Sequence, residues 1–231
     1  MQITSQTYQD ILASDDYWFE RKLVIAGVAY REDVLIEMTT LSEMFQKTPT
    51  IGKAVAAEIS VKMLAPDADI PPMAELKPYV QAKNATQTSE WLQQGVFYID
   101  TRDTVKNERG DDILSLHGFD AMLKAEQLYA GQLTGTSTDT QMVAEIARLM
   151  GLTVDARTYA IMNKSYQIPF PAGYTLREIL GYIASMYVGS FVISDVGELR
   201  LVTLLELPPE TNYLIDQVGD CITFGGDRIL V

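Results

Sequence analysis

His117 is the only histidine in the chain, and Cys221 is the only cysteine. A nucleophile–histidine–carboxylate arrangement would have to combine His117 with Asp120, three residues later, and with Cys221 or a serine from elsewhere. No sequence typical of a nucleophile elbow is present. One cysteine provides neither an intrachain disulfide nor a cysteine metal site. The pattern favours a structural histidine at a corner between a strand and a helix.

Adjacent carboxylates are the other candidates for chemistry, at Asp15-Asp16, Glu32-Asp33 and Asp111-Asp112. Glycoside hydrolysis needs two carboxyl groups that face each other across a cleft, and adjacency in sequence does not provide that. Asp67-Ala-Asp69 lacks the spacing and the glycine of an EF-hand calcium loop. We therefore predict no catalytic residue, no metal ligand and no cofactor, and we expect that the chain is not an enzyme.

The composition of the 231 residues is that of a globular protein, with 47% hydrophobic and 21% charged residues. No apolar run approaches the roughly 18 to 20 residues that span a bilayer. The net charge is −13, from 31 acidic and 18 basic residues. Such a surface repels phosphate backbones, which argues against sequence-specific binding of nucleic acid. An acidic surface of this kind would allow DNA to slide past without binding, and it would equally keep an ordinary protein in solution.

The first half of the chain has the alternation of β-structure. In residues 55–63, Val55, Ala57, Ile59, Val61 and Met63 share one face, while Glu58, Ser60 and Lys62 share the other. Gly27 separates two short strands as a tight hairpin. Pro78 predicts an edge position, or the start of a strand, because it cannot donate to a ladder. Several strands with regular turn signals predict an antiparallel barrel or sandwich.

The second half has signals typical of helices. Thr138 with Gln141, and Thr175 with Glu178, form two capping boxes, and Gly151 occupies a C-cap position. Residues 190–194 and 199–203 predict a β-hairpin. We place a barrel domain with short helices at residues 1–130, and a small α/β domain at residues 131–207. Residues 208–231 either return to the first barrel or begin a second, truncated one.

Residues 41–53 have no clear period and include apolar side chains that would be poorly tolerated in free solvent. We predict that Met44, Phe45 and Ile51 make contacts between subunits. The alternative is that they pack back onto their own domain. The sequence leaves both open.

Several stretches, taken in order and together, resemble the tail hub proteins of prophages of Gram-positive bacteria. They are residues 52–64, 70–75, 77–80, 91–102, 117–126 and 174–202. The resemblance implies an α+β fold, in which an antiparallel tail-tube-like β-barrel is followed by a small α/β domain. Hub proteins of this kind carry two barrels per copy, whereas this sequence has room for the first barrel and at most the opening strands of a second.

The same resemblance implies a structural component of the tail baseplate. Identical copies, expected as a homotrimer, would form a ring that joins the tail tube to the tail tip. The implied partners are the tail tube or distal tail protein, the tip or spike protein and the tape-measure protein, with DNA passing through without specific binding. The expected location is the virion tail, assembled in the bacterial host cytoplasm.

Two other functions remain open at this point. Related hub proteins carry lytic domains, so one alternative is a tail-associated cell-wall hydrolase or peptidase. The other is a carbohydrate-binding module of the tail tip, in which Trp91, Trp18 or exposed tyrosines would act as platforms for sugar rings.

Overall fold

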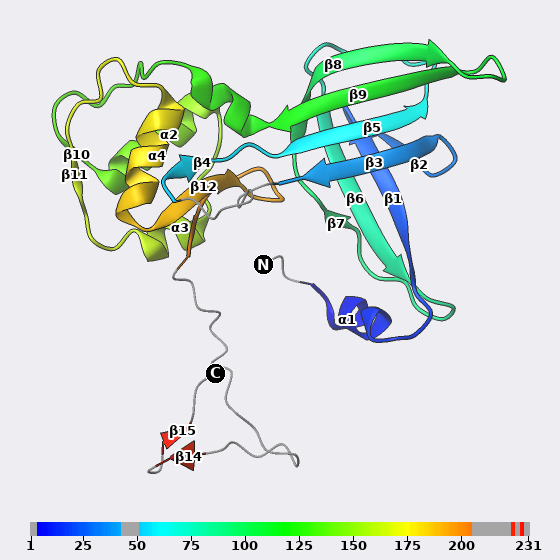
Figure 1. Cartoon of the computed structure of the whole chain (residues 1–231), viewed down its shortest axis with the longest axis horizontal. Coiled ribbons are helices and arrows are strands. Elements are labelled where there is room, and N and C mark those ends of the chain that lie inside the picture. The colour runs from blue at the N-terminus through cyan, green and yellow to red at the C-terminus, as the bar shows by residue number, and fades with distance from the viewer. Residues whose placement is uncertain (1–3, 43–50, 205–222, 225–226, 229–231) are drawn as a thin grey trace.

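The structure is a computed structural model that describes residues 4–42, 51–204, 223–224 and 227–228 (Figure 1). Two lobes are visible: a long antiparallel sheet on the right of the figure and a compact group of helices and short strands on the left. The fold is therefore α+β, with sheets that are mostly antiparallel. None of the helices in the described part of the chain is long and apolar enough to cross a membrane.

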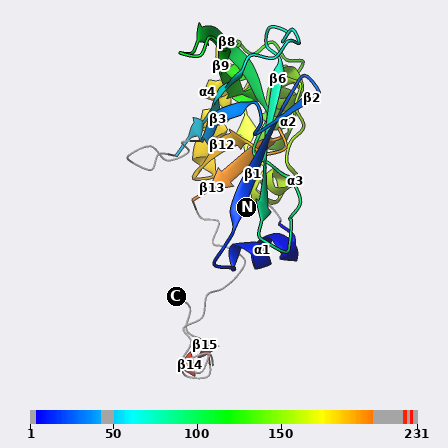
Figure 2. The ribbon, with the colours of Figure 1, turned by 90° about the vertical axis from the view of Figure 1, so that its right-hand side faces the viewer.

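The sheet lobe contains eight strands in the order β2-β1-β6-β8-β9-β5-β3, with β7 paired to β6. Their bounds are β1 (Trp18–Ile25), β2 (Val28–Arg31), β3 (Leu35–Leu41), β5 (Glu58–Leu64), β6 (Glu75–Lys83), β7 (Leu92–Gln93), β8 (Phe97–Lys106) and β9 (Asp112–Asp120). All of these pairs are antiparallel. Helix α1 (Gln6–Leu12) lies below the ends of β1 and β6 (Figure 2).

One apolar interior is shared by strands from across this sheet. Leu23 of β1, Leu35 of β3, Ile59 of β5 and Phe97 of β8 are buried in a single cluster. Strands at opposite ends of the sheet reach the same cluster only because the sheet curls around it. Among the described strands no ladder joins β2 to β3, so closure of a barrel stays a prediction.

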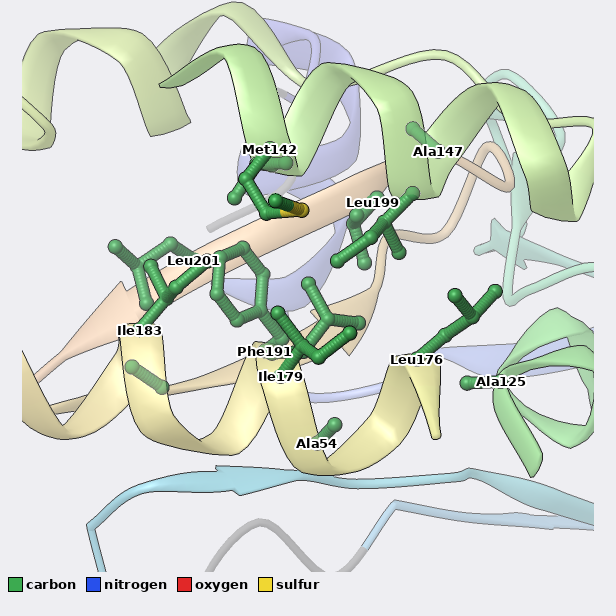
Figure 3. Close-up of a cluster of buried hydrophobic side chains, with 14 of the residues drawn as sticks. Ala54, Ala125, Met142, Ala147, Leu176, Ile179, Ile183, Phe191, Leu199 and Leu201 are labelled. Carbon is green, nitrogen blue, oxygen red and sulfur yellow. The ribbon is translucent and has the colours of Figure 1, made fainter. Parts of the chain in front are cut away.

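The second lobe packs helices against short strands. Its elements are β4 (Lys53–Ala54), the 3₁₀ helix η1 (Ala121–Glu126), β10 (Ser137–Thr138), α2 (Asp139–Met150), α3 (Ala156–Ile161), β11 (Gln167–Ile168), α4 (Leu176–Met186), β12 (Gly189–Ile193) and β13 (Leu199–Thr203). Figure 3 shows its core, where Met142 of α2 and Ile183 of α4 surround Phe191 and Leu201. A short pair, β14 (Thr223–Phe224) and β15 (Asp227–Arg228), is also described.

Local sequence signals explain where the helices begin and end. Both predicted capping boxes are confirmed: Thr138 with Gln141 begins α2, and Thr175 with Glu178 begins α4. In each, the threonine oxygen and the side chain three residues later satisfy backbone N–H groups that the first turn leaves free. Gly151 ends α2 with φ of 71°, a left-handed conformation that glycine adopts without steric cost.

The alternation predicted for residues 55–63 is confirmed in β5. Ile59, Val61 and Met63 are buried, whereas Ser60 and Lys62 are exposed. The strand begins later than predicted, at Glu58. The residues before it leave the sheet lobe, because β4 pairs in parallel with β12 and the N–H of Val55 donates to the Phe191 carbonyl at 2.8 Å.

Neither position predicted for Pro78 is right, because β6 has neighbours on both sides and begins three residues earlier, at Glu75. The Pro78 carbonyl accepts the N–H of Gln94 at 2.8 Å, so it faces away from β1. The nitrogen and the carbonyl of one residue face the same neighbour in an antiparallel pair. The Pro78 nitrogen therefore faces the interval where the partner of β6 changes from β8 to β7, and no ladder bond is lost there.

Candidate functional site

Of the residues that a nucleophile–histidine–carboxylate arrangement would need, the structure describes His117 and Asp120, and each is held by other partners. His117 lies within β9, where its Nε2 is 3.2 Å from the Glu58 carboxylate and its ring meets Phe119 edge-on. The strand continues to Asp120, so His117 is not at the corner itself. The Asp120 carboxylate accepts backbone N–H groups from Ala57 at 2.8 Å and from Met122 at 2.9 Å. Cys221 lies outside the described residues.

The paired carboxylates are part of surface turns and ion pairs. Glu32 is 3.5 Å from Arg21, and Asp112 is 3.0 Å from Lys106. Asp111 accepts from the Asn107 side chain at 2.9 Å across the tip of the β8–β9 hairpin. Within the part of the chain that the structure describes, no group of three or more histidine, cysteine or acidic side chains could hold a metal ion.

The most extensive polar feature is one face of the sheet, on the side away from its apolar core. The pairing of β3, β5, β9 and β8 places the side chains of this face in cross-strand rows. We call its polar part the outer polar face, which comprises Glu37, Thr39, Glu58, Ser60, Lys62, Thr101, Asp103, Ser115 and His117. At its two ends the same cross-strand rows carry apolar residues, namely Leu41 and Phe119 beside Glu58, and Val105 beside Ile113. A shallow hollow of about 370 Å³ lies in its centre.

The basic side chains on or near this face are held by neighbouring groups. Lys62 Nζ lies 3.1 Å from the Glu37 carboxylate, and His117 faces Glu58. Arg102 follows Thr101 on β8 and therefore projects to the other side of the sheet. There it donates to the carbonyls of Ile70 at 2.7 Å and Pro71 at 3.1 Å. The face thus carries hydroxyl groups, the Lys62–Glu37 and His117–Glu58 pairs and the carboxylate of Asp103, and among its described residues there is no row of unpaired cations that would hold phosphates.

Of the predicted contact residues, the structure describes Ile51, while Met44 and Phe45 lie outside the described residues. Ile51 is 45% exposed. It directly precedes Gly52, whose N–H donates to the Gly189 carbonyl at 2.7 Å. Residue 51 is therefore held at the surface of the helical lobe, although the segment of residues 41–53 begins at the end of β3 in the sheet lobe.

The two tryptophans differ in the surface that they present. Lys22 Nζ lies 4.4 Å from the ring of Trp91 and 4.4 Å from the ring of Tyr79. This cation–π contact occupies one face of Trp91, which sequence reasoning treated as free. Trp18 is 49% exposed at the start of β1, next to Tyr17 and Phe19, whose rings meet edge-on at 5.6 Å.

Asp120 is a residue whose position the sequence did not reveal. It caps η1 by accepting the N–H of Met122, and it also accepts the N–H of Ala57, 63 residues away. The side chain is buried, and this burial raises its pKa to about 6, while the two backbone hydrogen bonds and Arg177 act in the opposite direction. No local pattern signals such a contact, because its second partner lies in the distant connection between β4 and β5.

Comparisons with known proteins bear on the fold. No protein-family profile matches the chain, and no curated protein sequence matches it. Among solved structures, the 43 kDa tail protein of prophage MuSo2 from Shewanella oneidensis is 16% identical with a TM-score of 0.54, covering 90% of this chain and 61% of that one. A tail protein from Neisseria meningitidis MC58 is 14% identical with a TM-score of 0.51, covering 88% and 53%.

The chain therefore spans between about half and three fifths of these two proteins. Both likenesses extend over nearly all of this chain and include both lobes. At this level of identity they establish a shared fold. The chain has the fold of these two tail proteins, one of which comes from a prophage.

Proposed function

We propose that this protein is a structural component of the tail of a phage or phage-derived particle, and that it acts as a hub in the baseplate. The observation that carries the proposal is the fold shared over both lobes with two tail proteins, one of them from a prophage. The side-chain geometry agrees with a structural role, since His117 and Asp120 have structural partners, as do the carboxylates Glu32, Asp111 and Asp112. The location would be the virion tail, assembled in the host cytoplasm.

In this proposal, identical copies form a ring, a homotrimer, that joins the tail tube to the tail tip. The curled sheet would form part of the ring wall and would complete a tail-tube-like barrel. Ile51, with Met44 and Phe45, would contact a neighbouring subunit. An exposed isoleucine next to an anchored glycine favours this assignment, because an anchored backbone loses little entropy on binding.

The outer polar face is the part of the sheet best suited to line the ring's channel. DNA passes easily where phosphates meet no unpaired cations, and Lys62 and His117 on this face each have an acidic partner. Hydroxyl groups such as Ser60 and Thr101 present weak, exchangeable hydrogen bonds to a moving polymer. The tape-measure protein would pass the same surface. The tail tube or distal tail protein and the tip protein would contact the two rims.

The experiment that tests the proposal is native mass spectrometry of the purified full-length chain, followed by class-averaged electron micrographs. Ring-shaped particles of three or six copies are expected. Ile51→Asp should abolish them by placing a charge in the interface. Val196→Asp is the matched control, because Val196 is also exposed but lies in the turn between β12 and β13. A monomer at micromolar concentration, or equal loss in both variants, would contradict the proposal.

Carbohydrate binding at the tail tip is a second candidate, which the exposed ring of Trp18 favours. Aromatic side chains bind sugars through the faces of their rings, and Trp91 has one face covered by Lys22. The candidate therefore depends on Trp18. Glycan-array binding that is lost in Trp18→Ala and kept in Trp91→Ala would support it, and absence of glycan binding by the wild type would remove it.

A further inference from the structure

The first half of strand β1 is an open edge of the sheet. β1 pairs with β6 along its whole length, from Trp18 to Ile25, whereas β2 pairs with it only from Lys22 onward. On the β2 side, residues 18–21 therefore have no neighbouring strand among those that the structure describes. An edge of this kind presents backbone N–H and C=O groups to which another extended chain can bind.

The hydrogen bonds of the backbone show which groups are available. The N–H of Arg21 donates to the Glu32 carboxylate at 3.3 Å, so it points to the β2 side, and the carboxylate closes the edge at that residue. Phe19 lies two residues earlier, and alternate residues of an antiparallel strand direct their N–H and C=O groups to the same side. Both backbone groups of Phe19 thus point out of the open edge.

Exposed aromatic side chains surround this edge. Tyr17, Trp18 and Phe19 are 45%, 49% and 41% exposed, and helix α1 lies beside the start of their strand (Figure 1). Phe19 is on the face of β1 that carries the buried Leu23 further along, while Trp18 is on the opposite face. A strand added here would therefore find an aromatic side chain on each face of the sheet.

The charges around the edge indicate what kind of partner it binds. The first twenty residues contain four acidic side chains and no lysine or arginine. Glu20 is paired with Lys83 at 2.7 Å, whereas Asp15 and Asp16 are exposed in the turn that leads into β1. A second copy of the chain, with its net charge of −13, would be repelled from this acidic end. A basic segment would be attracted to it.

We propose that the open edge of β1 binds an extended segment of a partner protein in which basic and apolar residues alternate. The segment would add to the sheet as an antiparallel strand beside residues 18–21, with its backbone bonded to Phe19. Its apolar side chains would lie on the face of Phe19. Its basic side chains would lie on the face of Trp18, whose ring attracts cations, and close to the turn of Asp15 and Asp16.

The size of the site determines the character of the complex. Few backbone groups are available, so the interface is small, and its charged contacts are open to solvent. The complex should therefore be weak and should weaken further with added salt. The site is on the sheet lobe, whereas Ile51 is on the helical lobe, so the proposal holds whether or not the chain forms a ring.

The test uses the purified full-length chain and a fluorescent ten-residue peptide of alternating lysine and valine, with binding measured by anisotropy at low salt. Asp15→Lys with Asp16→Lys should weaken binding about tenfold, because two attractive contacts become repulsive. The matched control is Asp67→Lys with Asp69→Lys, which changes the net charge equally at exposed positions between β5 and β6 and should keep most of the binding. A peptide that does not bind the wild type, or equal weakening in both variants, would overturn the proposal.

Two modified peptides test the addition of a strand without any change in the protein. Residues that exchange hydrogen bonds across an antiparallel pair lie on the same face, so the valine N–H groups would point to Phe19 and the lysine N–H groups to solvent. Methylation of the valine nitrogens should abolish binding, whereas methylation of the lysine nitrogens should preserve it. The unmodified peptide should also protect the Phe19 amide from hydrogen exchange. Equal binding of the two methylated peptides, or an unprotected Phe19 amide, would contradict the addition of a strand.

Two other occupants of the edge would give different results. A neutral glycan stacked on Trp18 would not respond to the reversal of charge at Asp15 and Asp16, and glycan binding without peptide binding would rule out the proposed partner. A second copy of the chain would appear as self-association that the peptide inhibits. That result would assign the edge to an interface between copies, and the proposal would be wrong.

Discussion

Gly52 lies where the chain returns from residues 41–51 to the surface of α4, directly after the candidate contact residue Ile51. Its φ is +76°, and a Cβ placed on it would collide with the Ser185 side chain and lie 3.3 Å from the Gly181 carbonyl oxygen. Gly181 faces it from the helix: a Cβ there would lie 2.8 Å from the Gly52 oxygen. Two glycines thus let the segment and the helix approach at backbone distance.

We predict that Gly52→Ala destabilises the protein by about 2 to 4 kcal/mol. A left-handed conformation at a residue with a Cβ costs about 1 to 2 kcal/mol. The Ser185 hydroxyl must also turn away and give up its 3.0 Å hydrogen bond to the Gly181 carbonyl, which costs about 1 kcal/mol. Displacing the remaining atoms by a few tenths of an ångström adds up to about 1 kcal/mol.

Gly110→Ala is the matched control. Gly110 has φ of +88° in the turn between β8 and β9, and a Cβ there would meet nothing within 4 Å. It should therefore lose only the conformational part, about 1 to 2 kcal/mol. Urea denaturation of both variants gives the difference directly. If Gly52→Ala were no less stable than Gly110→Ala, the segment would not be seated on α4, and the positioning of Ile51 would need another explanation.

Three further variants test other parts of the structure. Thr175→Ala removes the capping-box oxygen at the start of α4 and should lower the free energy of unfolding by about 1 kcal/mol in urea, whereas an unchanged midpoint would contradict the cap. The folded-state pKa of Asp120, about 6, lies above the ordinary 3.8, so its neutral carboxyl group stabilises the folded protein below about pH 4, and this stabilisation is lost as the pH rises through 6. Relative to Asp120→Asn, the free energy of unfolding of the wild type should fall by about 3 kcal/mol over that range. A difference between the two proteins that does not change with pH would refute this. Ser60→Lys with Ser115→Lys adds two unpaired cations to the outer polar face and should create salt-dependent binding of DNA, measured by fluorescence anisotropy, that the wild type lacks; equal binding by both proteins would show that this face does not control contact with DNA.

The features that the sequence predicts well are those encoded within a few residues. Thr138 with Gln141, and Thr175 with Glu178, are capping boxes because both partners lie in one helical turn. The hairpin of β12 and β13 follows from a short turn between two apolar runs. The alternation of β5 identifies its buried face without knowledge of its neighbours.

Pairing between distant segments was not predictable in this way. The parallel contact of β4 with β12 joins Ala54 to Phe191, and neither residue carries a local signal for the other. Pro78 predicted an edge because a proline normally interrupts a ladder, and a change of partner strand is visible only in three dimensions. The bridge from Asp120 to Ala57 belongs to the same class of long-range contact.

The candidate site followed the same division. The alternation of the sequence predicts that Glu58, Ser60 and Lys62 lie on the polar face of their strand. Only the order of the strands in the sheet places Thr101 and Ser115 on the same face. The surroundings of Trp18 and Trp91 also depend on strand pairing. The pairing of β1 with β6 decides that Lys22 lies over the ring of Trp91, and the positions of the aromatic residues in the sequence do not predict this pairing.

An electron cryomicroscopy reconstruction of the purified particle would show whether the protein forms a ring and which face of the sheet lines its channel. The structural-hub account predicts a closed ring of identical copies in which the outer polar face, with Ser60 and Ser115 at its centre, lines a continuous channel. A monomeric particle, or a ring in which this face is buried between subunits or turned to the outside, would contradict it.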